Sequence, residues 1–182
     1  MKINVKQLTM TAMLLAICIA SQFFKNFSVY ITGPIINAAL IIAVFYCGLA
    51  SALMLAAVTP ITAFIITGSP VMSAVPAIIP CVIAGNAVLV IVIHFTKGLF
   101  GKKIGVPVSI VLGSVVKAAL MGLLISVWLL PAYLPEKMGK MMPVLKMQFS
   151  VVQLTTALIG GVYAILIMAA LSRTEFNPNK ES

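Results

Sequence analysis

Residues 106–130 read VPVSIVLGSVVKAALMGLLISVWLL and contain one charged side chain, Lys117. A helix needs about 20 mainly apolar residues to cross the hydrocarbon core of a bilayer. This stretch is long enough to do so, and Lys117 lies near its middle. The segment therefore predicts a transmembrane helix with a charge deep in the membrane.

The rest of the chain is just as apolar. Of its 182 residues, 62% are hydrophobic and 8% are charged, whereas a soluble domain is about half apolar and a quarter charged. The apolar runs are continuous and lack the alternation that membrane β-strands show. We therefore expect an all-α membrane protein, a six-transmembrane-helix bundle that forms one integral membrane domain over residues 1–182. The predicted spans are residues 8–24, 35–47, 50–66, 77–95, 106–130 and 143–171.

The basic residues predict the orientation of the bundle. Six spans place both termini on one side, and cytoplasmic loops carry the excess of Lys and Arg. Seven basic residues fall on the side of the termini and four on the other, so both termini are predicted to be cytoplasmic, in the cell membrane. The first group is Lys2, Lys6, Lys97, Lys102, Lys103, Arg173 and Lys180, and the second is Lys25, Lys137, Lys140 and Lys146.

Several function classes are excluded by what the sequence lacks. Eleven of the twelve basic residues flank apolar runs, so the excess of basic residues over three acidic ones predicts no nucleic-acid partner. There is no aspartate, and the three glutamates lie outside the spans. No paired carboxylates, Ser/His/Asp set, phosphate-binding loop or metal-binding cysteine spacing can be assembled. We therefore predict no enzymatic activity, metal or cofactor, and any uphill transport must draw its energy from a partner protein.

Lys117 is the first candidate functional residue. A Lys at the centre of a span costs about 3 kcal/mol on insertion scales, and no span contains a carboxylate that could pair with it. It could face an internal cavity, or it could pair with backbone carbonyls as a structural ion. The missing counter-ion favours an anionic solute as its partner.

Four amide side chains join Lys117 as candidates for substrate contact. Asn86 lies deep in the fourth span, with an interhelical hydrogen bond as its alternative role. Asn37 is predicted near the outer end of the second span. Gln148 and Gln153 lie five residues apart in the sixth span. They would occupy different faces of one helix, so one of them is expected to face inward.

Two aromatic residues at the outer end of the fifth span complete the set. Trp128 and Tyr133 could stack on a ring-bearing solute, although anchoring at the membrane interface is the alternative. Most of the candidates fall in the outer half of the spans, with Lys117 and Asn86 deeper. This distribution predicts a pocket that opens to the outside.

The first span carries a stripe of small residues, Ala12, Ala16 and Ala20, along one helical face. Such a stripe allows close helix approach, and ordinary packing inside the bundle is the alternative. With six short spans, a basic amino terminus and no machinery for energy conversion, the chain resembles the substrate-binding S component of an energy-coupling factor (ECF) vitamin transporter. The local resemblance lies in LTMTAMLLAICIA (residues 8–20), VTPITAFIITGSP (58–70) and PAIIPCVIAGN (76–86).

The resemblance implies a partner and a mechanism. In this family the alanine stripe contacts a transmembrane scaffold subunit, which couples to two ATPase subunits, so Ala12, Ala16 and Ala20 would form the docking face. A vitamin or vitamin precursor is bound from outside and released inward, and Lys117 favours an anionic one. The alternative is a holin-like pore or structural oligomer. A pore would carry a polar stripe along its full length, which these spans lack.

Overall fold

The computed structural model describes residues 5–24 and 28–173, except for the side chains of residues 102 and 103. Several charged residues used above therefore lie outside the described residues or side chains: Lys2, Lys25, Lys102, Lys103, Glu175, Lys180 and Glu181. Within the described part the chain is helical, with no strand.

Six helical segments are long and apolar enough to cross a membrane, which confirms the predicted six-helix bundle. The first four segments are single helices, and a short helix, α4, lies between the third and the fourth of them. The fifth and sixth are each composed of shorter pieces. In chain order the elements are α1 (Val5–Gln22), α2 (Val29–Tyr46), α3 (Leu49–Thr67), α4 (Pro70–Ala74), α5 (Ile78–Thr96), α6 (Gly101–Met121), the π-helical η1 (Gly122–Leu129), α7 (Leu130–Tyr133), the short η2 (Glu136–Met141), α8 (Met142–Gln148) and α9 (Val151–Leu171).

The second span begins earlier than the sequence predicted. Ser28 caps α2, because its side chain accepts a hydrogen bond from the Tyr30 amide at 3.1 Å, which satisfies an amide that the helix itself leaves free. The helix therefore includes Gly33 and Pro34, which lie before the predicted boundary at residue 35. As a result Asn37 lies well inside the helix and not near its outer end.

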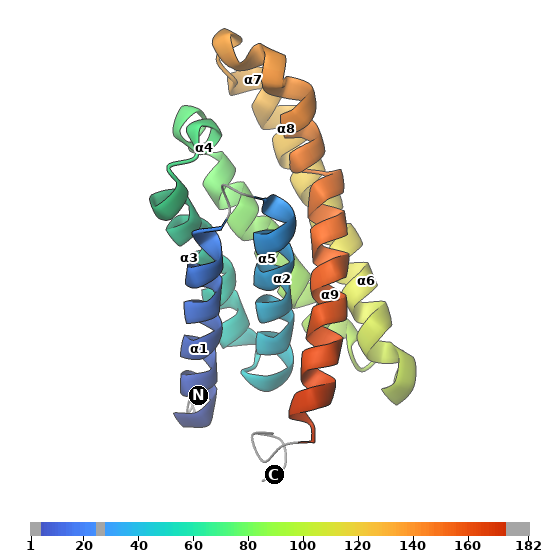
Figure 1. The fold of residues 1–182 in the computed structure, drawn as a ribbon. Coiled ribbons are helices and arrows are strands. Elements are labelled where there is room, and N and C mark those ends of the chain that lie inside the picture. The colour runs from blue at the N-terminus through green and yellow to red at the C-terminus, as the bar shows by residue number, and fades with distance from the viewer. Residues whose placement is uncertain (1–4, 25–27, 174–182) are drawn as a thin grey trace.

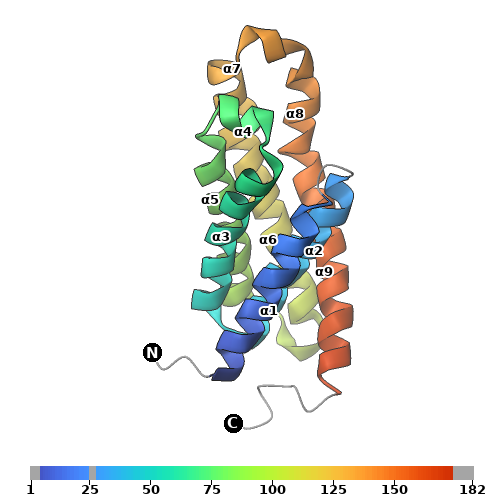
Figure 2. The same ribbon diagram turned by 60° about the vertical axis from the view of Figure 1, so that its left-hand side comes forward.

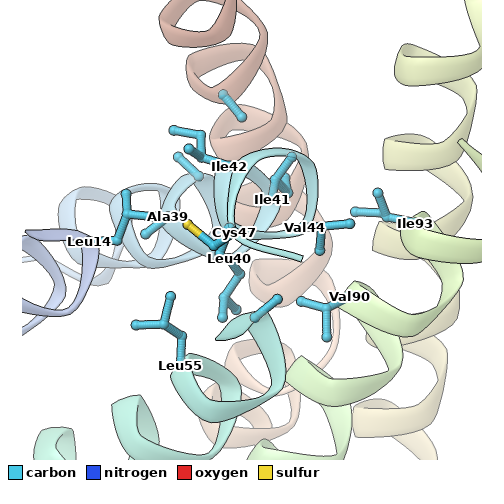
Figure 3. Packing of buried hydrophobic residues seen from close by; sticks show 14 of the residues in the cluster. Leu14, Ala39, Leu40, Ile41, Ile42, Val44, Cys47, Leu55, Val90 and Ile93 are labelled. Carbon is cyan, nitrogen blue, oxygen red and sulfur yellow. The ribbon is translucent and has the colours of Figure 1, made fainter. Parts of the chain in front are cut away.

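α2 is the central helix of the bundle. It packs against α1, α3, α5 and α9, and Figure 3 shows its side chains surrounded by residues from several of these helices. Leu40, Ile41 and Val44 of α2 meet Leu14 of α1, Leu55 of α3, and Val90 and Ile93 of α5. Cys18, Cys47 and Cys81 are free thiols.

The connections between the helices determine at which end of the bundle each span begins and ends. Gly48 has φ +85° between α2 and α3, a conformation that glycine adopts without strain, so the chain reverses there within two residues. The first turn of α1 and the last turn of α9 lie at the same end of the bundle, as an even number of spans requires (Figure 1). The opposite end is formed by α4 and by a hairpin of α7 and α8 (Figure 2).

α2 and α9 approach closely because α9 has a glycine at the contact. A Cβ added at Gly160 would lie 2.6 Å from the Pro34 carbonyl oxygen and 2.7 Å from the Asn37 Cβ. A side chain at this position therefore forces the two helices apart. The contact also fixes the height of Asn37 against α9.

We expect Gly160→Ala to lower the free energy of unfolding by about 1–3 kcal/mol, the usual cost of overpacking a filled interior. Thermal unfolding of the purified protein in detergent measures the change. Gly139→Ala is the matched control, because nothing lies within 4 Å of a Cβ added there. Equal stability of the two variants would contradict the close contact.

Candidate functional site

Lys117 of α6 is at the centre of the site. Its side chain is 2% exposed, and its Nζ donates hydrogen bonds to Asn37 Oδ1 at 2.6 Å and to Asn86 Oδ1 at 2.8 Å. The three residues come from α2, α5 and α6, and Asn37 and Asn86 are also buried. Lys117 is thus held by side-chain amide oxygens and not by backbone carbonyls. Neither amide carries a charge that could neutralise the ammonium group.

The two amides differ in how they are held. Asn37 Nδ2 donates to the Gly33 carbonyl oxygen at 2.9 Å, which orients its Oδ1 towards Lys117. Asn86 Nδ2 has no hydrogen-bond partner within the described part of the chain. Gly85 beside it leaves room for Met121, since a Cβ at residue 85 would lie 2.5 Å from the Met121 Cγ. The site therefore has one fixed amide and one with free donors.

The Lys117 cluster opens into a cavity of about 210 Å³. The cavity lies between α2, α3, α5, α6 and the sixth span. It is at the end of the bundle where α4 and α8 lie, away from the start of α1 and the end of α9 (Figure 1). Apolar side chains such as Ile36, Val82 and Phe149 form much of the wall. None of the described residues that line it is acidic. The polar residues that line it are Thr32, Asn37, Thr59, Ser69, Asn86, Lys117, Gln148 and Gln153.

Five of the seven predicted substrate-contact residues line this one cavity: Asn37, Asn86, Lys117, Gln148 and Gln153. Trp128 and Tyr133 do not. Trp128 on η1 is 58% exposed and Tyr133 on α7 is 61% exposed. Exposed aromatic side chains near the end of a span commonly anchor a protein at the membrane interface. A role for any of the seven in binding a substrate stays a prediction.

Gln148 and Gln153 both line the cavity, although the sequence placed only one of them inside. The prediction assumed one continuous helix. The sixth span is instead interrupted at Phe149 and Ser150, between α8 and α9. This break changes the angular relation between the two side chains, and Gln153 Nε2 donates to the Gln148 carbonyl oxygen at 3.3 Å.

Gln22 is a buried polar residue that the sequence reading overlooked. It is 1% exposed, and its Nε2 donates to the Thr59 carbonyl oxygen at 3.0 Å and to Thr62 Oγ1 at 3.1 Å. Its Oε1 has no hydrogen-bond partner among the described residues. Since Thr59 lines the cavity, Gln22 connects the end of α1 to the cavity wall. The available signal was that this amide falls within the predicted first span, residues 8–24.

The alanine stripe of α1 faces away from the bundle. Ala12, Ala16 and Ala20 are exposed, while Leu14 and Cys18 on the other side of α1 are buried. Within the described part of the chain, the stripe is therefore not buried by packing. It leaves a smooth strip of helix surface on the outside of the bundle.

Six helical segments long and apolar enough to span a membrane define a multi-pass membrane protein, and a small cavity that contains the Lys117 cluster lies among them. The family model described as "ECF transporter, substrate-specific component" matches residues 6–172. The chain therefore belongs to the family of substrate-specific components of ECF transporters, which confirms the resemblance seen in the sequence. Comparison with curated proteins and with solved structures gave no match.

The hydrogen bond between Lys117 and Asn86 predicts energetic coupling between the two residues. In a double-mutant cycle, Lys117→Met and Asn86→Leu should be non-additive by about 1–2 kcal/mol, because Lys117→Met leaves Asn86 Oδ1 without its donor and Asn86→Leu removes one of the two acceptors of Lys117. Chemical unfolding in detergent measures the four free energies. Gln153→Leu is the control, since Gln153 lines the same cavity without a bond to Lys117. Additivity of the first pair would contradict the bond.

Proposed function

We propose that this protein captures a vitamin or vitamin precursor from the outer side of the cell membrane. It then delivers the solute inward while docked on a scaffold subunit that two ATPase subunits drive. Family membership supports the general part of this proposal, namely that the protein is a substrate-specific component of an ECF transporter. The observation that carries the proposal is the Lys117 cluster, a buried cation at the base of a solute-sized cavity.

The position of the cavity supports capture from outside. It lies at the end of the bundle away from the start of α1 and the end of α9. If the basic residues place the termini in the cytoplasm, as the positive-inside rule predicts, this end faces outward. Exposed Lys6 and Arg173 belong to the cytoplasmic end in that orientation.

The exposed face of α1 supports docking on a scaffold subunit. Small side chains let two membrane helices approach closely, so that van der Waals packing can drive their association. Ala12, Ala16 and Ala20 offer such a strip, flanked by the exposed side chains of Met13 and Ile17. A pore-forming role has no comparable support, because the cavity polar groups gather at one end of the bundle.

We expect Ala16→Trp to abolish co-purification with the scaffold and ATPase subunits of an ECF module, because the bulky indole would hold α1 away from the scaffold helix that packs on it. Pull-down from membranes that co-express all subunits measures the loss. Ala119→Trp is the matched control, since Ala119 is an exposed alanine on α6, away from the stripe.

Unimpaired assembly of the Ala16→Trp variant would refute the docking face. Uptake tests the function itself. In membrane vesicles that contain the protein with its scaffold and ATPase subunits, the solute should accumulate on the side of the ATPases. This accumulation should require ATP on that same side. Passive conductance by the purified chain alone would favour a pore instead.

A further inference from the structure

We infer that the solute is a small monocarboxylate, no larger than one six-membered ring with a short substituent, whose carboxylate is held by Lys117 and Asn86. This inference rests on the proposed function, because it assigns a chemical class to the solute of the same cavity. Charge, donor count and volume support it separately.

The charge of the cavity excludes cations and favours a single negative charge. Lys117 is the one cationic side chain among the described residues that line the cavity, and no acidic side chain lines it. Its two partners, Asn37 and Asn86, contribute oxygen atoms without charge. In a medium of low dielectric constant an unpaired ion is costly, so an anion completes the site. A second negative charge would find no cation there.

The free hydrogen-bond donors fit a carboxylate. A Lys ammonium has three donors, and two of them are used on Asn37 and Asn86. The third remains, together with both donors of Asn86 Nδ2, which belongs to the same amide that accepts from Lys117. Two adjacent donor groups with one positive charge match the two oxygens of a carboxylate. A phosphate carries about −1.5 to −2 charges, whereas Lys117 is the one cationic side chain among the described residues that line the cavity.

The volume sets the size of the rest of the molecule. Pockets for drug-sized ligands measure about 300–1,000 Å³, and this cavity measures about 210 Å³. An engineered apolar cavity of about 150 Å³ holds benzene, so the present volume accommodates one ring and a carboxylate. The wall beyond the Lys117 cluster includes Ile36, Val82, Leu145 and the buried ring of Phe149. These side chains suit the faces of a flat ring.

The test uses four probes and the full chain in detergent. Benzoate is a one-ring carboxylate, benzamide its neutral amide, benzylamine a one-ring cation and 2-naphthoate a two-ring carboxylate. The readout is the shift in thermal unfolding temperature. We expect benzoate to raise that temperature, and the neutral, cationic and two-ring probes to leave it unchanged. Lys117→Met should abolish the temperature shift caused by benzoate. Lys137→Met is the matched control and should keep that shift, because Lys137 is exposed and does not line the cavity.

A second variant keeps the test decisive if Lys117→Met does not fold. Asn86→Leu removes the free donors and should weaken benzoate binding at least tenfold by titration. Stabilisation by benzylamine, equal stabilisation by benzoate and benzamide, or no effect of benzoate would each overturn the inference. So would native mass spectrometry that finds a cation or a two-ring solute bound to the purified protein.

The outcomes separate this inference from the proposed function. If the protein still assembles with the scaffold and ATPases and drives uptake of a neutral or cationic solute, the solute class is wrong and the function stands. If benzoate binds as expected and no assembly with an ECF module occurs, the function is wrong and the carboxylate site stands.

Discussion

The burial of Lys117 in the membrane is the constraint on which the site depends. An ammonium group deep in a span is costly unless it is hydrogen-bonded and reached by polar groups. Here the bonds come from Asn37 on α2 and Asn86 on α5, so one side chain fixes the relative height of three helices. Gly160 supports this by letting α9 lie against Asn37, and Gly85 by leaving space for Met121.

The hydrogen bonds hold the Lys117 ammonium group in place, but none of them supplies a negative charge to balance it. Asn37 is held from both sides, by Lys117 and by the Gly33 carbonyl, which makes it a rigid support. Asn86 keeps free donors, and none of the described residues that line the cavity offers Lys117 an acidic partner. A site that is prepared in this way loses little entropy when a solute binds, because its polar groups are already placed. Gln22 ties the cavity wall at Thr59 to α1, the helix that presents the alanine stripe.

The number of spans was predictable because long apolar runs in a chain with 8% charged residues have few other folds. Lys117 and Asn86 were identifiable because the cost of burial makes a polar residue in mid-span conspicuous. The start of α2 was not predictable from hydropathy, since it depends on a cap at Ser28. The shared cavity position of Gln148 and Gln153 depends on a break at Phe149 and Ser150 that apolar composition does not reveal.

How much a polar residue reveals depends on its depth in the membrane. A tryptophan or tyrosine near the end of a span is stabilised at the interface whatever the protein does, so Trp128 and Tyr133 carried little information about the cavity. Gln22 was overlooked for the same reason, because an amide at the end of an apolar run can reach water. An ionisable residue in mid-span has no such alternative. Lys117 therefore required partners inside the bundle, and those partners, Asn37 and Asn86, define the site.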